Sequence, residues 1–237
     1  HGFNSFLPSV MDFTLNDALV KSFSERNSNW ETGMTRIYKN LQNDFLYPNI
    51  NNLLIFAENH DTNRINDSYP EFKSYKRIMA ALMTLRGIPQ IYYGSEIGMT
   101  GKKENGDGDI RRDFPGGWIS DKKNAFNKKE RTPVQKSYFN FTKKLINWRR
   151  TKSVIHNGKT LHYVPENDVY VYFRYSEKSR VMVIINNSPE KQNLSLDRFH
   201  EGISGRTNGF EIISEKQISL AKNLEVSPET AYIIELH

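Results

Sequence analysis

Hydrophobic and polar positions follow two different periods along this chain, and the change comes near residue 153. Before it, apolar residues recur every three or four positions in long segments, which is typical of amphipathic helices. After it, apolar and polar residues alternate, which is typical of strands. We therefore predict two domains, an α/β part over residues 1–152 and an all-β part over residues 153–237.

Short apolar runs in the first part are predicted strands, and longer amphipathic segments are predicted helices. The run over residues 53–57 is continuous, as in a strand buried on both faces of a parallel sheet. The predicted strands cover residues 7–13, 53–57 and 88–93. The predicted helices begin at the capping residue Thr14, cover residues 30–42 and 72–86, and begin again at Pro133.

Alternation in the second part predicts roughly eight strands separated by turn residues, which is typical of a β-sandwich. The clearest strands cover residues 162–164, 169–175, 181–187, 192–196, 209–213, 217–220 and 231–236.

Composition narrows the class of protein. Of the 237 residues, 37% are hydrophobic and 25% are charged, as in a globular domain, and no apolar run approaches the length of a membrane span. The absence of cysteine excludes disulfides and thiolate metal sites. The net charge is +6, but basic and acidic residues are mixed and no nucleic-acid motif is found, so we predict no nucleic acid and no membrane as partners. A bacterial periplasmic or extracellular location is favoured over a cytoplasmic one.

Polar residues gather directly after the apolar run over residues 53–57. They include an acid, an amide, a base and a guanidinium, namely Glu58, Asn59, His60, Asp61 and Arg64. In α/β proteins the carboxyl ends of parallel strands are where ligands bind. Spacing alone leaves open whether this segment is a functional site or a polar turn that leads into a helix.

Residues 56–64 resemble the Asn-His-Asp motif on barrel strand seven of the α-amylase family, glycoside hydrolase family 13. Residues 9–13 resemble strand six, and residues 87–99 resemble strand eight, in the same order. Residues 109–118 resemble the loop after strand eight in neopullulanase-like and cyclomaltodextrinase-like members. The resemblance implies the C-terminal part of a (β/α)8 TIM barrel, strands six to eight, followed by an antiparallel β-sandwich domain.

The resemblance also implies roles. The family acts on α-1,4-glucans such as starch, maltodextrin, cyclodextrin or pullulan by a retaining mechanism. By resemblance, Asp61 is the carboxylate that stabilises the transition state, and His60 binds hydroxyls of the same sugar. Arg64 is assigned to substrate binding, where it orients carboxylates by bidentate pairing. Asn59 is expected to hold the turn, and Glu58 to be solvated or ion-paired.

Two catalytic groups of the family are missing from this sequence. A retaining glycosidase needs a nucleophile and an acid, both carboxyl groups, which in this family follow strands four and five. No matching segment is present, so we expect the C-terminal part of a longer enzyme, inactive alone. Open sheet edges suggest pairing with the missing N-terminal part or with a second copy. A glucanotransferase, an α-glucosidase and a non-catalytic carbohydrate-binding remnant stay open as alternatives.

Several other positions keep two interpretations each, one functional and one structural. Asp12 either faces the active site or bonds neighbouring backbone, Tyr69 either stacks on sugar or packs, and Trp118 either stacks on glucose or anchors its loop. Glu96, Arg111, Arg112 and Asp113 lie near the expected rim. Residues 105–109 have alternating oxygen ligands but lack the glutamate that completes an EF-hand loop, so we predict no metal and no cofactor.

Overall fold

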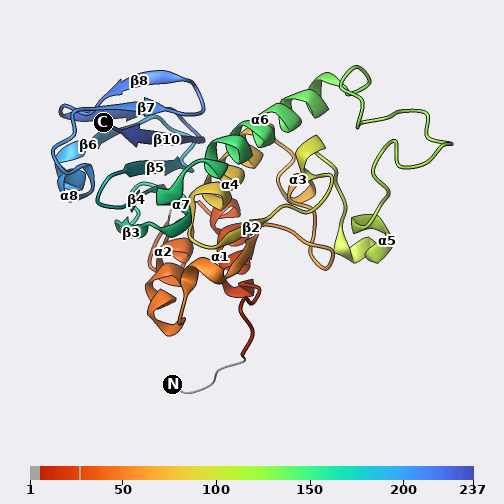
Figure 1. The fold of residues 1–237 in the computed structure, drawn as a ribbon, viewed down its shortest axis with the longest axis horizontal. Coiled ribbons are helices and arrows are strands. Elements are labelled where there is room, and N and C mark those ends of the chain that lie inside the picture. Colours follow the sequence, from red (N-terminus) through yellow and green to blue (C-terminus); the bar gives the residue numbers. More distant parts are fainter. Residues whose placement is uncertain (1–5, 27) are drawn as a thin grey trace.

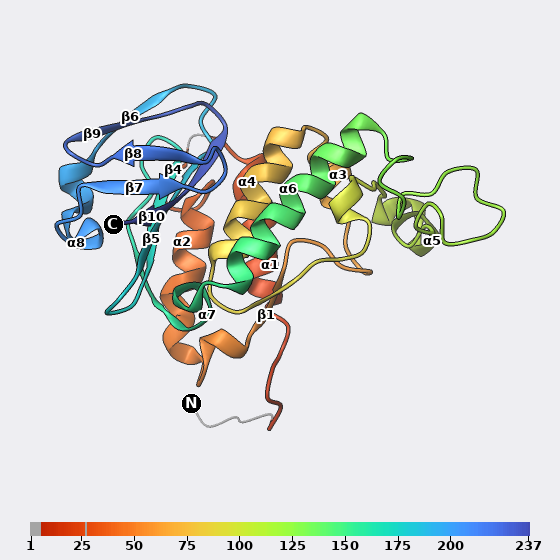
Figure 2. The same cartoon turned by 45° about the horizontal axis from the view of Figure 1, so that its top comes forward.

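The computed structural model describes residues 6–26 and 28–237 and places a mostly helical part beside a β-sheet part (Figure 1). The α-helices are α1 (Phe13–Ser24), α2 (Thr35–Gln42), α3 (Ile65–Ser68), α4 (Phe72–Thr84), α5 (Asp107–Ile110), α6 (Pro133–Arg150), α7 (Ser153–Asn157) and α8 (His200–Ile203). The 3₁₀ helices are η1 (Asn43–Leu46), η2 (Ile50–Asn52), η3 (Ser95–Ile97), η4 (Lys103–Asn105) and η5 (Leu196–Phe199). In both views α4 and α6 lie side by side next to the β part (Figure 2).

The helical part contains a short parallel sheet. Strand β1 (Leu54–Phe56) pairs with β2 (Ile88–Gln90), and Met11 forms a parallel bridge to Leu54 on the other side of β1. The strand predicted over residues 7–13 is therefore reduced to this bridge. The reason is that helix α1 begins at Phe13, where Asp12 and not Thr14 is the N-cap: its carboxylate accepts from the Leu15 N–H at 2.9 Å.

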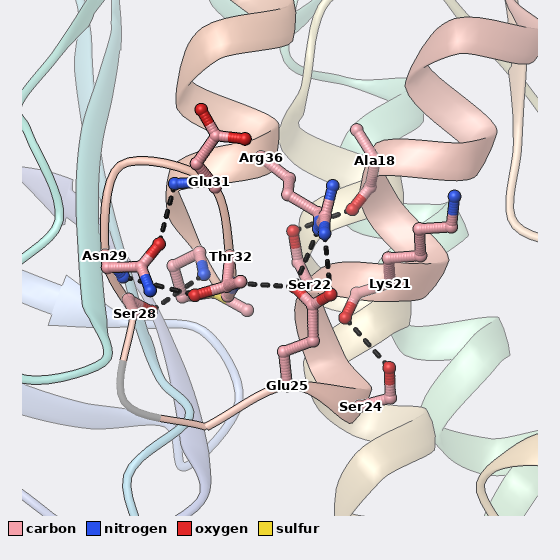
Figure 3. Close-up of polar contacts among 12 residues, drawn as sticks. Ala18, Lys21, Ser22, Ser24, Glu25, Ser28, Asn29, Glu31, Thr32 and Arg36 are labelled. Carbon is pink, nitrogen blue, oxygen red and sulfur yellow. Dashed lines mark hydrogen bonds and ion pairs between the residues drawn. The ribbon is translucent and has the colours of Figure 1, made fainter.

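The helix predicted over residues 30–42 begins later, at Thr35, because side chains bind the backbone before it. Glu25 accepts from the Gly33 N–H at 2.7 Å and receives both Nε and Nη2 of Arg36 at 2.7 Å (Figure 3). Asn29 accepts from the Glu31 N–H at 2.7 Å, which forms a turn. Hydrogen bonding to Arg36 lowers the pKa of Glu25, so this loop is held by an ionised pair.

The β part is a sandwich of two antiparallel sheets. The larger has the strand order β3-β4-β5-β10-β7-β8, and β6 pairs with β9 in the smaller. The strands are β3 (Lys159–His162), β4 (Val169–Tyr175), β5 (Arg180–Asn186), β6 (Gln192–Ser195), β7 (Asn208–Glu211), β8 (Lys216–Ser219), β9 (Asn223–Val226) and β10 (Thr230–Leu236). The predicted sandwich is confirmed, although β9 and α8 were not expected from the sequence.

The central strands of the larger sheet are buried on both faces. On β4, Tyr170 and Tyr172 belong to the core shared with the helices, whereas Val171 and Phe173 face the core inside the sandwich. The apolar run at residues 181–185 divides in the same alternating way. Because one core spans both parts, the domain boundary predicted between residues 152 and 153 stays a prediction. Over the described residues, no helix is long and apolar enough to cross a membrane.

Candidate active site

The turn after β1 exposes His60, Asp61 and Asn63 and buries Glu58, Asn59 and Arg64. Asn59 is 1% exposed and closes the turn: its Oδ1 accepts from the Asp61 N–H at 2.8 Å, and its own N–H donates to Thr62 Oγ1 at 2.9 Å. The side chains of His60 and Asp61 are 58% and 51% exposed. Asn59 therefore holds the turn, as the sequence indicates, and the turn displays the two residues expected to meet substrate.

His60 and Asp61 form a polar cluster with a residue from a distant loop. His60 Nε2 lies 3.2 Å from Asp61 Oδ2, and Arg111 Nη2 lies 3.0 Å from Asp61 Oδ1. Arg111 Nε also donates to the His60 carbonyl at 2.9 Å, and its Nη2 pairs with Asp107 at 2.9 Å. The sequence placed Arg111 near the rim but gave no sign of this contact, because 50 residues separate it from Asp61.

Of the two states expected for Glu58, solvated or ion-paired, the structure shows the second, because Glu58 is buried and pairs with Arg64 at 3.4 Å. It is 2% exposed and accepts hydrogen bonds from Ser95 Oγ and the Ile65 N–H. Burial raises its pKa, while Ser95, Ile65 and Arg64 act in the opposite direction. Glu58 is therefore shielded from solvent, and its hydrogen bond with Ser95 joins the turn to the 3₁₀ helix η3.

Arg64 lies beneath the surface. Its guanidinium carbon is 3.8 Å from the centre of the Tyr92 ring, its Nη1 donates to the Tyr93 carbonyl at 2.5 Å, and its Nε donates to the Ile110 carbonyl at 3.0 Å. Its contact with Glu58 is a single one of 3.4 Å, so the expected bidentate pairing is wrong. With 0% of its surface exposed, Arg64 does not reach a ligand directly in this structure. Its hydrogen bonds to the carbonyls of Tyr93 and Ile110 hold the turn in place.

Asp12 and Tyr69 have structural roles. Asp12 caps α1 and pairs with Arg86, and the Tyr69 hydroxyl donates to the Val20 carbonyl while its ring packs on the main core. Trp118 is 63% exposed, so it does not anchor its loop by burial. Among residues 6–26 and 28–237, no group of three or more His, Asp or Glu side chains is arranged to hold a metal ion.

Gly101 lets two segments of the loop after β2 pack closely against each other. A Cβ atom there would lie 2.4 Å from the Asp109 carbonyl oxygen, a backbone atom. The Gly101 carbonyl also accepts from the Arg64 N–H at 2.9 Å, and the Lys103 N–H donates to Asn63 Oδ1 at 2.6 Å. Residues 101–112, which we name the clamp loop, are thereby fastened to the turn that carries His60 and Asp61.

Substituting Gly101→Ala is expected to lower the free energy of unfolding by about 1–2 kcal/mol, because the added methyl group overpacks backbone. Urea unfolding measures this. Gly108→Ala is the matched control in the same loop, since a Cβ there meets nothing within 4 Å. Equal stability of the two variants would contradict the close approach.

Comparison with known proteins assigns both parts of the chain. Residues 4–158 match the family model for the α-amylase catalytic domain. The chain belongs to the α-amylase family. Residues 160–235 match the model for the cyclomaltodextrinase C-terminal domain. The predicted family and fold class are thus confirmed.

Curated members of the α-amylase family match most of this chain. The cyclomaltodextrin glucanotransferase of Niallia circulans is 31% identical over 196 residues, 83% of this chain and 24% of that protein. The cyclomaltodextrinase of Thermoanaerobacter pseudethanolicus is 28% identical over 229 residues, 95% of this chain and 36% of that protein. The chain therefore spans about a quarter to a third of the length of these relatives.

Solved structures show the same fold. The α-amylase of Geobacillus thermoleovorans, complexed with acarbose, superposes with a TM-score of 0.75 at 21% identity, covering 98% of this chain and 48% of that one. AmyP in complex with maltose superposes with a TM-score of 0.76 at 17% identity, covering 99% of this chain and 51% of that one.

Proposed function

We propose that this chain carries one half of the active site of an enzyme that acts on α-1,4-glucans by a retaining mechanism. The observation that carries the proposal is the exposed His60–Asp61 pair, with 3.2 Å between Nε2 and Oδ2, at the carboxyl end of a parallel strand. The names of the relatives, cyclomaltodextrinase and cyclomaltodextrin glucanotransferase, support a glucan as the substrate.

Asp61 is suited to gripping a sugar at the reacting centre. A carboxylate has about four lone-pair sites, and His60 and Arg111 occupy one on each oxygen. The remaining sites can accept from neighbouring sugar hydroxyls. In this proposal those hydrogen bonds strengthen as the ring flattens toward an oxocarbenium-like transition state. His60 then binds a hydroxyl of the same sugar.

The two carboxyl groups that make and break the bond are assigned to segments outside this chain. Glu58 is the acid closest in sequence to the pair, but it is enclosed by Ser95 and Ile65. We therefore infer that the chain alone does not hydrolyse glucans.

Hydrolysis of maltotriose by the complete product of the gene, measured beside this chain, tests the proposal. The complete product is expected to cleave it and to release sugar of retained anomeric configuration, seen by proton NMR, whereas this chain is expected to release none. Cleavage by this chain alone would place its nucleophile and acid among residues that we treat as structural.

Glucan transfer is a second candidate, favoured by the 31% identity to a cyclomaltodextrin glucanotransferase. The two reactions differ in whether water or a sugar hydroxyl attacks the intermediate. Chromatography of the products separates them, since transfer gives longer or cyclic glucans and hydrolysis gives shorter linear ones. A complete product that binds glucan without either reaction would leave carbohydrate binding as the function.

Substituting Asp61→Asn is expected to weaken binding of maltotriose to this chain about tenfold, because hydrogen bonds to a charged acceptor become bonds to a neutral one. Isothermal titration calorimetry measures the affinity. Asp17→Asn on the exposed face of α1 is the control, since its carboxylate contacts Lys21 and no residue of the site. Unchanged affinity in the Asp61 variant would remove Asp61 from the binding site.

A further inference from the structure

We propose that Arg111 is a positioning residue, which fixes the Asp61 carboxylate in one orientation so that its free lone pairs face a sugar together. This inference rests on the proposed function, because it assigns Arg111 a part in the same site. It differs from a sugar contact, since Arg111 is proposed to act through Asp61.

The contacts of Arg111 converge on the displayed pair. Its Nη2 lies 3.0 Å from Asp61 Oδ1, and its Nε donates to the His60 carbonyl at 2.9 Å. One guanidinium thus binds the backbone of one residue and the side chain of the next. A planar guanidinium holds such a pair of acceptors in a fixed geometry, which a single ammonium group does not.

Arg111 is itself held from the other side. Its Nη2 pairs with Asp107 at 2.9 Å, and Asp107 in turn binds Lys103. Lys103 donates its backbone N–H to Asn63 at 2.6 Å, which ties the clamp loop to the turn a second time. The guanidinium is therefore braced between the clamp loop and Asp61.

The Asp61 side chain needs a contact that fixes its orientation, because it is 51% exposed. An exposed aspartate samples several rotamers, and ordering it on ligand binding costs free energy. His60 contacts one carboxylate oxygen and Arg111 the other, at 3.2 and 3.0 Å. Removing Arg111 leaves the carboxylate with His60, itself 58% exposed, as its side-chain partner.

The neighbouring Arg112 provides a matched control. Its side chain is 51% exposed, against 40% for Arg111, and it binds Asp109 in the clamp loop and the carbonyl of Thr100 directly before that loop. Its side chain makes no contact with the His60–Asp61 turn among its hydrogen bonds and ion pairs in the described residues. Arg111→Gln and Arg112→Gln therefore lose the same charge and similar packing in the loop. Only Arg111→Gln also loses the contact with Asp61.

The test combines maltotriose affinity with the rotamer of Asp61, read from three-bond NMR couplings to its carboxyl carbon. Arg111→Gln is expected to weaken binding about tenfold and to average the Asp61 couplings over several rotamers, while Arg112→Gln stays within about twofold of the parent. Arg111→Lys is expected to recover part of the loss. In an Asp61→Asn background, Arg111→Gln is expected to cost less than about twofold more, because it acts through Asp61.

Each contrary result overturns the inference. A single unchanged Asp61 rotamer in Arg111→Gln, or an equal effect of Arg112→Gln, would show that Arg111 does not set the orientation. If Arg111→Gln weakened maltotriose binding about tenfold in the Asp61→Asn background too, this would show a direct contact between Arg111 and sugar. The rotamer is measured without ligand, so it decides the positioning role even if this chain alone binds no maltotriose, whereas the proposed function is decided separately by maltotriose hydrolysis with the complete product of the gene.

Discussion

Substituting Arg86→Met is expected to lower the free energy of unfolding by about 4 kcal/mol, since it leaves a buried carboxylate without its counter-charge. Arg86 is 1% exposed, and its Nη1 lies 2.7 Å from Asp12 Oδ2, while its Nη2 lies 2.6 Å from Asp44 Oδ1. The side chain of Asp12 is fully buried. Methionine fills a similar volume, so the expected loss is electrostatic. Urea unfolding followed by circular dichroism measures it.

A double-mutant cycle separates the charge from the packing. Asp12→Asn keeps a side-chain oxygen for the cap on Leu15 but removes the charge, so the double variant Arg86→Met/Asp12→Asn is expected to be more stable than Arg86→Met alone. Lys21→Met, which breaks an exposed pair with Asp17, is expected to cost less than about 0.5 kcal/mol. A loss below about 1 kcal/mol in Arg86→Met would contradict the electrostatic explanation.

The Asp12–Arg86 pair illustrates what the sequence predicts and what it leaves open. Apolar periodicity located β1 and α4, because those patterns are local. For Asp12 the sequence left a structural role and a place at the active site open, and it assigned the helix cap to Thr14. Its partner Arg86 was not predicted, since 74 residues separate the two and no local pattern encodes the contact. Pairing at that range is decided by tertiary packing.

The candidate site shows the same division. The motif itself placed His60 and Asp61 at the end of a strand, and the structure displays both side chains there. The burial of Arg64 was not predicted, because it depends on Tyr92 and on the Ile110 carbonyl, 46 residues away. A polar residue next to an apolar strand looks exposed in sequence, but Tyr92, Tyr93 and the returning clamp loop cover Arg64.

Substituting Glu229→Gln is expected to lower the free energy of unfolding by about 3 kcal/mol, because Glu229 joins the β part to the helical part. Its carboxylate lies 2.6 Å from Arg26 Nη2, 2.5 Å from Lys73 Nζ and 3.7 Å from Arg77 Nη2. Arg77 is 1% exposed, and burial lowers its pKa to about 10. Removing the negative charge of Glu229 leaves the buried Arg77 cation beside Arg26 and Lys73, of which Lys73 keeps a pair with Glu71 at 3.0 Å.

The pH dependence gives a second measurement of the same cluster. Burial raises the pKa of Glu229, but hydrogen bonds from Lys73 and Arg26 and the charge of Arg77 outweigh it and lower the pKa from 4.5 to about 2. Since the folded-state pKa is the lower one, the stabilisation is present above about pH 4.5 and is lost as pH falls toward about 2. Arg26 and Lys73 are half-exposed, so solvent screens their interaction with Glu229. After allowance for this screening, ionisation of Glu229 contributes about 2 kcal/mol to the free energy of unfolding.

The stability difference between the parent and Glu229→Gln is therefore expected to be constant near neutral pH and to shrink between about pH 4.5 and pH 2. Glu225→Gln on β9 is the control, because its pair with Lys191 is exposed on both sides and is expected to contribute less than about 0.5 kcal/mol at any pH. A difference that persists unchanged to pH 2 would mean that Glu229 acts by packing, and that the charge cluster does not hold the two parts together.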